Sequence, residues 1–518
     1  MSKTILYDTT LRDGTQREGI SLSVQDKITI AKKLDLLGID FIEGGWPGSN
    51  PKDVQFFEEA KSLPFFKKKI AAFSATRHKS SKVATDPNVK AVLASGVHTA
   101  TIVGKTWDLH VRKALETTLE ENLKMIAETI SFLKEKGLQV IYDAEHAFDG
   151  CKANAQYALQ TFLAAQKAGA DYIVLCDTNG GSTPEQIEEI IKKIQVKITT
   201  PLGIHAHNDG EFAVANSFTA YKLGVHLIQG TINGFGERCG NANLCSIIAN
   251  LKLKYAVPCI TDQQLARLTE VSRFVSEIAN IPHDNHLPYV GKSAFAHKGG
   301  IHASAMAKDS STYQHIAPEL VGNTSRTVIS ELAGRSNIIA KAKTLGLELS
   351  TNEAKAVLAT VKSLESKGFQ FENADASFEL LLRKNETGYK APFTLVDYLV
   401  LVEQRNTPNL LSEAMVKLQV KGQVLHTVAD GNGPVNALDC AIRKALTKVY
   451  PSIANIELLD YKVRILNEAD GTEAQVRVLI ESGNAKNRWI SVGSSTNIIE
   501  ASLFALLDSL EYGLTIKQ

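Results

Sequence analysis

Short apolar runs alternate with longer amphipathic stretches through the first half of the chain. The runs are rich in β-branched and aromatic residues, as strands are, and the stretches repeat apolar positions every three or four residues, as helices do. Eight candidate strands are found: 4–9, 41–45, 69–75, 99–104, 138–145, 172–178, 202–207 and 227–232. Helical patterns between them include 23–38, 119–137, 153–169 and 183–194. Strands that alternate with helices indicate a parallel sheet.

The number of these units decides between two α/β folds. Eight strand–helix units in about 250 residues fit a TIM (β/α)8 barrel. The alternative is a doubly wound sheet, but its glycine-rich phosphate turn is missing, because the first strand is followed by TLRDGTQREG. We therefore predict a barrel over residues 1–260.

The pattern changes after the predicted barrel. A helix is expected over 262–280, then a connector rich in glycine and histidine over 283–304, then mixed helical segments. Residues 261–390 are therefore predicted to form a helical linker subdomain.

The last part of the chain, residues 391–518, is again rich in strand patterns. Segments 426–446 and 490–510 form a weak internal repeat at an offset of 64 residues, and each copy has the pattern of a strand, a turn and a helix. This repeat predicts a two-layer α/β domain with internal pseudo-symmetry.

Composition excludes several classes of protein. Lys+Arg number 57 and Asp+Glu 56, so the net charge of +1 provides no field that would attract nucleic acid or anionic lipid. No window approaches the roughly 18 apolar residues of a membrane helix, and the N-terminus has no charged-then-apolar leader. Six cysteines without a CxxC pair disfavour a disulfide framework and an all-cysteine zinc site. We expect a cytoplasmic protein with no nucleic-acid or membrane partner.

Polar clusters lie where the predicted strands end, which is where the reactive groups of TIM barrels are found. His205 and His207 are two residues apart, so on a strand their side chains point to the same side. Asp13, after the first strand, adds an oxygen ligand, and this set suits Mg, Mn or Zn. Asn241, after the eighth strand, offers a carbonyl oxygen or holds a water. A hydrogen-bonded structural pair of histidines is the alternative.

Three further residues at these strand ends are candidates for chemistry. Arg12 can stabilise negative charge on a substrate oxygen, although beside Asp13 it can also form a structural ion pair. Glu145 is a candidate general base, or else a solvated residue at a strand end. Thr178 either binds a carboxylate through its hydroxyl or caps the following turn.

Several motifs in order resemble the α-isopropylmalate, homocitrate and citramalate synthases over nearly the whole chain. They are DTTLRDGTQ (8–16), HAHND (205–209), NGFGERCGN (233–241), FAHKGGIHASA (295–305) and GNGPVNAL (431–438). The segment FIEGGWPGSNPKD (41–53) looks most like the citramalate synthase branch.

The resemblance implies a divalent-metal Claisen condensation of acetyl-CoA with pyruvate, followed by thioester hydrolysis to citramalate and CoA, in isoleucine biosynthesis. The family's metal ligands fall on Asp13, His205, His207 and Asn241. Its catalytic residues fall on Arg12, Glu145, His302 and Tyr313, and its keto-acid contacts on Arg12, Asp143 and Thr178. Asp143 and His146 depart from the commonest family pattern, which affects the shape of the keto-acid pocket.

The resemblance also implies a homodimer, in which His302 acts in its own subunit or in the neighbouring barrel. The C-terminal domain looks like the family's regulatory domain, with isoleucine as the effector in the citramalate branch, and pure dimerisation is the alternative. Three other functions are weighed: a 2-isopropylmalate synthase that uses 2-oxoisovalerate, a metal-dependent acyl-CoA lyase, and a non-catalytic amino-acid sensor. The intact set of Arg12, Asp13, Glu145, His205 and His207 argues against the sensor.

Overall fold

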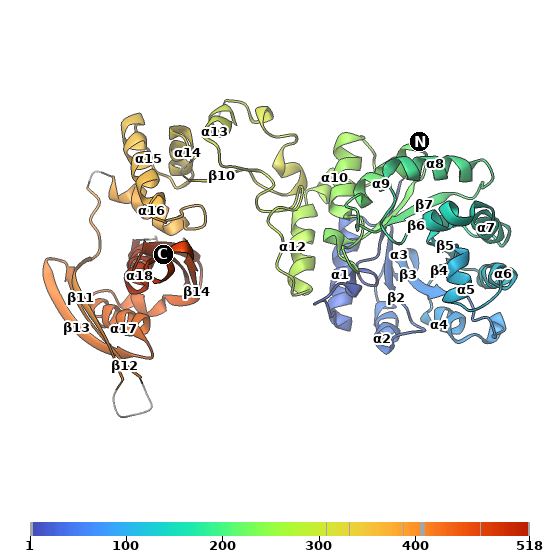
Figure 1. Ribbon diagram of the computed structural model, residues 1–518, viewed down its shortest axis with the longest axis horizontal. Coiled ribbons are helices and arrows are strands. Elements are labelled where there is room, and N and C mark those ends of the chain that lie inside the picture. The colour runs from blue at the N-terminus through green and yellow to red at the C-terminus, as the bar shows by residue number, and fades with distance from the viewer. Residues whose placement is uncertain are drawn as a thin grey trace. The chain divides into compact units, whose positions relative to one another are not determined.

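The computed structural model describes residues 4–306, 308–330, 332–386, 388–404, 410–466 and 468–515 (Figure 1). The chain divides into two compact units. The first comprises residues 1–295 and 316–325, and the second residues 296–315 and 326–518.

The first unit contains a closed barrel of eight parallel strands in sequence order, with β1 paired to β8. Its strands are β1 (Ile5–Asp8), β2 (Phe41–Gly45), β3 (Ile70–Ala75), β4 (Thr99–Lys105), β5 (Gln139–Glu145), β6 (Tyr172–Asp177), β7 (Leu202–Ala206) and β8 (Leu227–Gly230). The predicted TIM barrel and all eight predicted strands are confirmed.

Helices surround the barrel, and several begin at the polar residue that the sequence places there. Ser23 caps α1 with a capping box, and Thr183 does the same for α8. The α-helices are α1 (Val24–Leu37), α2 (Pro51–Ala60), α3 (Phe66–Lys69), α4 (Pro87–Ser95), α5 (Asp108–Lys113), α6 (Leu119–Glu135), α7 (Ala147–Lys167), α8 (Pro184–Gln195), α9 (Ala213–Lys222), α10 (Leu244–Lys254), α11 (Asp262–Leu265) and α12 (Leu268–Ile278). Short 3-10 turns are η1 (Gly14–Gln16), η2 (Val83–Thr85), η3 (Ile232–Gly234) and η5 (Pro318–Val321).

Two helix boundaries differ from the prediction. Helix α7 begins at Ala147 rather than 153, because its first turn continues directly from the strand end and is separated from the rest by non-helical dihedrals at Asn154. The helix predicted over 262–280 is divided into α11 and α12. The break lies beside Ala266, whose carbonyl oxygen would be 2.1 Å from a Cβ on Gly322. This close approach of a distant loop is invisible to local periodicity.

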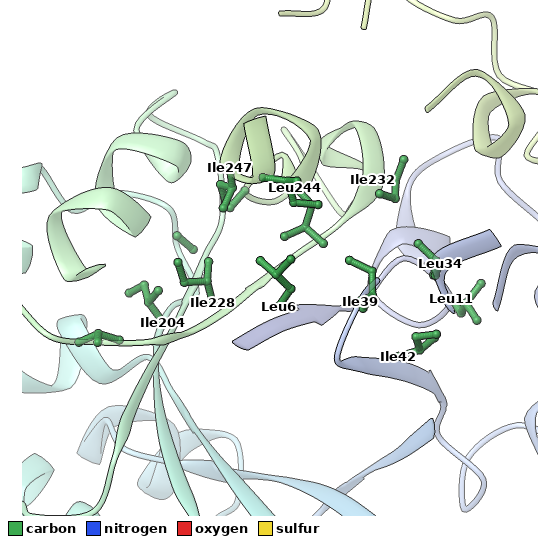
Figure 2. Close-up of a cluster of buried hydrophobic side chains, with 14 of the residues drawn as sticks. Leu6, Leu11, Leu34, Ile39, Ile42, Ile204, Ile228, Ile232, Leu244 and Ile247 are labelled. Carbon is green, nitrogen blue, oxygen red and sulfur yellow. The ribbon is translucent and has the colours of Figure 1, made fainter. Parts of the chain in front are cut away.

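The main hydrophobic core lies between the barrel strands and the helices. Figure 2 shows Leu6, Ile42, Ile204 and Ile228 from the strands and Leu244 from α10 gathered in one cluster. Each of these side chains is fully buried, which contributes about 1.5–3 kcal/mol apiece. A smaller cluster fills the barrel interior and comprises Tyr7, Ala71, Ile141, Val174, Cys176 and Leu227. Successive side chains of a strand point to opposite faces, so alternate strand residues contribute to the outer core and to the barrel interior.

The second unit begins with short elements and then three longer helices. They are β9 (Ala296–His297), α13 (Gly300–Met306), η4 (Ser310–Thr312), β10 (Arg326–Thr327), α14 (Arg335–Thr344), α15 (Thr351–Glu365) and α16 (Asp375–Lys384). Strands β9 and β10 pair in parallel. The predicted helical region after the barrel is confirmed.

Two similar halves follow, each an antiparallel sheet of three strands and then a helix. The first half has β11 (Thr394–Gln404), β12 (Leu410–Val420), β13 (Gln423–Gly431) and α17 (Pro434–Leu446). The second has η6 (Pro451–Asn455), β14 (Glu457–Ile465), η7 (Glu468–Glu473), β15 (Val476–Gly483), β16 (Arg488–Ser495) and α18 (Ile498–Thr515). Helix α17 packs on β12 and β13, and α18 packs on β15 and β16. The two-layer α/β domain suggested by the repeat is confirmed.

The two copies of the repeat agree in the burial of matching helix residues but differ in the burial of matching strand residues. Ala437 and its counterpart Ala501 are both fully buried, but Val428 is 38% exposed whereas Val492 is fully buried. Helix α16 packs against β16, and the Ser377 hydroxyl on α16 accepts a hydrogen bond from the amide of Val492. The linker helices therefore pack on the second half of the repeat.

Among the helices of the described residues, none has the length and apolar character that crossing a membrane requires.

Candidate active site

A cavity of about 420 Å³ opens at the carboxyl ends of the barrel strands. Seven of the ten predicted site residues line it: Arg12, Asp13, Asp143, Glu145, Thr178, His205 and His207. They come from strands or loops that are far apart in the sequence, so closure of the barrel brings them together. An eighth residue, Asn241, contacts Asp13 and His205.

Four side chains converge at one side of this cavity. The His205 Nε2 atom lies 3.2 Å from Asp13 Oδ2 and 3.3 Å from His207 Nε2. Asn241 Nδ2 donates to Asp13 Oδ2 at 2.6 Å. None of the four residues is more than 6% exposed. The sequence prediction that these residues lie together is therefore matched by the geometry.

This group has the chemistry of a cation site. One ligand atom from each of Asp13, His205 and His207 lies within 4.8 Å of the others. Asn241 Oδ1 and His207 Nδ1 are buried without a hydrogen-bond partner among the described residues. Buried polar atoms without a partner are costly. Two imidazoles and a carboxylate suit a divalent metal ion.

Electrostatics favours metal-binding protonation states for two of the three ligand candidates, Asp13 and His207. Burial, followed by the nearby His205, lowers the pKa of His207 to about 3, so its imidazole is neutral at pH 7. Burial opposes ionisation of Asp13, but Arg12 and His205 outweigh it and hold the pKa of Asp13 below its usual value. Burial likewise lowers the pKa of His205, but the hydrogen bond to Asp13 outweighs this effect and raises it. The contact between His205 Nε2 and Asp13 Oδ2 is the one that a bound cation would replace.

Glycines shape the loop that carries Asn241. A Cβ on Gly236 would lie 2.0 Å from Asn241 Oδ1. Gly240 has φ of +89°, and a Cβ there would lie 2.0 Å from the carbonyl oxygen of Gly234. The positive φ and the close backbone oxygen require glycine at position 240, and the buried Asn241 side chain favours glycine at position 236, which accounts for the GxxxG spacing of GERCG within the motif NGFGERCGN.

Arg12 is held on three sides at the edge of the cavity. Its Nε donates to Glu43 Oε2 at 2.6 Å, its Nη1 lies 3.6 Å from Asp13 Oδ1, and its guanidinium carbon lies 3.9 Å from the centre of the Phe73 ring. Glu43 has no exposed surface and also accepts from the Tyr7 hydroxyl at 2.9 Å. A guanidinium fixed in this way can present its remaining N–H groups to a substrate oxygen without a cost in side-chain freedom.

Glu145 ends β5 and forms an ion pair with Lys105, which ends β4. Asp143, two residues earlier, is buried, and burial followed by the charge of Glu43 raises its pKa to about 7.

The Thr178 hydroxyl accepts from the amide of His146 at 2.9 Å, which leaves its proton to be donated. His146 itself turns its ring to Asp149 and packs against the tilted ring of His110, and it does not line the cavity.

The two remaining predicted residues lie together in the second unit. The rings of His302 and Tyr313 are stacked with centroids 4.0 Å apart and an interplanar angle of 23°. His302 is exposed, and Tyr313 is 43% exposed. The structure thus brings these two together as a pair, and their catalytic role stays a prediction.

Similar proteins of assigned function decide the family. The chain is 53% identical over 517 residues to the "(R)-citramalate synthase" of Geobacter sulfurreducens, which covers 99% of this chain and 98% of that protein. It is 53% identical over 516 residues to the "(R)-citramalate synthase" of Aquifex aeolicus, with the same two shares covered. The chain belongs to the citramalate synthase family. Members of this family are acyltransferases, so the chain is an enzyme of that class.

Family models divide the citramalate synthase chain into three parts. Residues 3–275 match "HMGL-like", residues 289–368 match "Homocitrate synthase post-HMGL domain-like", and residues 372–514 match "LeuA allosteric (dimerisation) domain". The "Probable 2-isopropylmalate synthase" of Methanopyrus kandleri is only 29% identical over 506 residues, covering 97% of this chain and 96% of that protein. The comparisons thus agree with the citramalate synthase branch that residues 41–53 indicated.

Local sequence patterns did not identify three polar residues of this candidate site. Glu43, Lys105 and Gln229 hold Arg12, Glu145 and His205 respectively. Glu43 and Gln229 each lie in the middle of an otherwise apolar strand, FIEGG and LIQG. A polar residue inside a buried strand requires a partner, and this signal would have drawn attention to both.

Proposed function

We propose that the chain condenses acetyl-CoA with pyruvate and hydrolyses the resulting thioester to citramalate and CoA. The observation that carries this proposal is that the ligand candidates Asp13, His205 and His207 share one cavity with Arg12 and Glu145. The 53% identity to (R)-citramalate synthases supports the choice of pyruvate.

Asp13, His205 and His207, with Asn241 beside them, would hold a divalent cation such as Mg, Mn or Zn. When bound, the cation supplies Lewis-acid activation of the keto acid's ketone. Arg12 donates hydrogen bonds to the same oxygen as it gains negative charge. Its attachment to Glu43 keeps the guanidinium in place during the reaction.

Proton transfer falls to the residues around Glu145. Its carboxylate accepts a proton from the methyl group of acetyl-CoA, and the resulting carbon nucleophile forms the new C–C bond to the ketone carbon. Thr178 donates its hydroxyl proton to the keto acid's carboxylate, and Asp143 shapes the same pocket. Water then cleaves the thioester, which releases CoA.

The second unit contributes protons and regulation in this proposal. The stacked His302 and Tyr313 protonate the new alkoxide, either in their own subunit or in a partner's barrel. Residues 372–514 form a homodimer and bind isoleucine as the end-product effector of isoleucine biosynthesis. The match to a family model described as allosteric and dimerising supports this assignment.

CoA release from acetyl-CoA tests the function. We expect release with pyruvate, little with 2-oxobutyrate or 2-oxoisovalerate, loss in EDTA and inhibition by isoleucine. A clear preference for 2-oxoisovalerate would assign the chain to 2-isopropylmalate synthesis instead. Cleavage of citramalyl-CoA without condensation would assign it to the lyases. His207→Ala, checked for folding by circular dichroism, is the inactive control, and unaltered CoA release by this variant would refute the site.

A further inference from the structure

Gln229 joins two residues of the site across the barrel interior. It lies on β8 and has no exposed surface. Its Oε1 lies 2.7 Å from His205 Nδ1, and its Nε2 donates to Asp143 Oδ1 at 3.0 Å. A single amide therefore connects β5, β8 and β7.

The direction of these hydrogen bonds follows from the chemistry of the groups. Gln229 Nε2 lies at Asp143 Oδ1 and donates to it, so the amide oxygen is turned to His205. An amide oxygen only accepts, so His205 Nδ1 must be the donor. In a neutral imidazole the other nitrogen, Nε2, then carries the lone pair. That nitrogen is the one that faces Asp13 and His207.

The two histidines differ in this respect. Among the described residues, His207 Nδ1 has no hydrogen-bond partner, whereas His205 Nδ1 is held by Gln229. Only one imidazole of the pair is therefore oriented from behind by a buried side chain.

We propose that Gln229 is a positioning residue of the metal centre: it sets the tautomer and ring orientation of His205 so that Nε2 ligates a divalent cation. Asp143 acts one step further out by orienting the amide of Gln229. This inference rests on the proposed function, because it assumes that Asp13, His205 and His207 hold a cation. Partners behind a ligating histidine typically change metal affinity by about 10–100-fold when removed.

The test measures Mn²⁺ binding to the full chain by isothermal titration calorimetry after dialysis against a chelator. Gln229→Met keeps the length of the side chain but removes the strong acceptor and the donor. Gln229→Glu restores an acceptor for His205 Nδ1. Asn216→Leu is the matched control, because Asn216 is another fully buried amide, which donates to the Ser182 carbonyl and does not line the cavity.

We expect Gln229→Met to weaken Mn²⁺ binding by about 10–100-fold, Gln229→Glu to bind close to wild type, and Asn216→Leu to bind as wild type does. The inference is overturned if the folded Gln229→Met chain binds Mn²⁺ as tightly as wild type. It is also overturned if Asn216→Leu loses as much affinity, because the loss then reflects general packing. If wild type itself binds no divalent cation, the proposed metal centre fails, and that result is distinct from the first two.

Discussion

Lys105 and Glu145 are register partners at the ends of the adjacent parallel strands β4 and β5, and their side chains form an ion pair. Both line the cavity, and their side chains are 24% and 22% exposed. A partly exposed ion pair stabilises a fold by at most about 1 kcal/mol. The main effect of this ion pair is therefore to fix the position of the Glu145 carboxylate in the cavity.

Lys105→Met should lower kcat while leaving the free energy of unfolding nearly unchanged. Without the ammonium group, the Glu145 carboxylate can rotate away from the acetyl-CoA methyl group, and such a misplacement costs up to about 100-fold. Steady-state CoA release measures the effect, and Lys105→Arg should retain most of the activity. Lys134→Met is the matched control, because Lys134 pairs with Asp171 at the opposite end of the barrel. Equal losses in the two methionine variants would contradict the prediction.

Removal of metal should both inactivate and destabilise the enzyme. Dialysis against EDTA should abolish CoA release, and Mn²⁺ or Mg²⁺ should restore it. A cation that binds only the folded state at 100 times its Kd adds about 2.7 kcal/mol to the free energy of unfolding. Thermal unfolding of wild type should therefore shift upward on addition of Mn²⁺. Asp13→Asn should show no such shift, and a full shift in that variant would exclude Asp13 as a ligand.

Glu43→Gln should impair both stability and activity. Glu43 is fully buried and holds Arg12 at 2.6 Å, so neutralising it leaves a guanidinium that is only 14% exposed with one fewer counter-charge. Breaking a buried ion pair typically costs about 3–5 kcal/mol, and the retained hydrogen-bonding capacity of glutamine reduces that loss. Urea unfolding and CoA release are the two measurements. A variant with wild-type stability and wild-type kcat would show that Arg12 is positioned without Glu43.

Asp8→Asn should alter the pH dependence of stability. Burial, opposed by hydrogen bonds from Thr10, raises the pKa of Asp8 to about 7. The unfolded value is about 3.9, so the stability contributed by the protonated carboxyl is fully present below about pH 4 and is lost as the pH rises through about 7.

The asparagine variant lacks this titration, so its stability relative to wild type should increase between pH 5 and pH 8.5, by about 2.7 kcal/mol. Urea-unfolding midpoints at pH 5, 7 and 8.5 give the comparison. Parallel pH profiles for the two proteins would refute the assignment.

Leu399→Asp should weaken the proposed dimer. Leu399, Met415 and Val428 lie in one row across the first sheet of the C-terminal domain, and Leu399 is 61% exposed. A charge in an apolar row opposes burial against a second copy. Sedimentation velocity should show a shift from dimer to monomer, whereas Lys448→Asp, at an exposed position just after α17, should leave the dimer intact. A monomeric wild type would contradict the proposed dimer itself.

Much of this enzyme follows from local sequence patterns. Apolar runs of five to eight residues alternate with helical stretches, and this pattern located all eight barrel strands. The motifs that end these strands identified Asp13, His205 and His207, because TIM barrels place reactive groups at the carboxyl ends of strands. Both inferences need only the periodicity of side chains along a strand or helix and the order of the elements.

The partners of these residues were decided by tertiary structure. Gln229 and Asp143 are 86 positions apart, and Lys105 and Glu145 are 40 apart. Whether such residues meet depends on strand register and on closure of β1 against β8, neither of which is encoded in a short segment. The same holds for Val428 and Val492, which match in the repeat but differ in burial. The sequence by itself determined which elements form and which ligand candidates they carry, whereas only the tertiary structure decided which buried side chains hold those candidates in place, because that depends on contacts between distant strands.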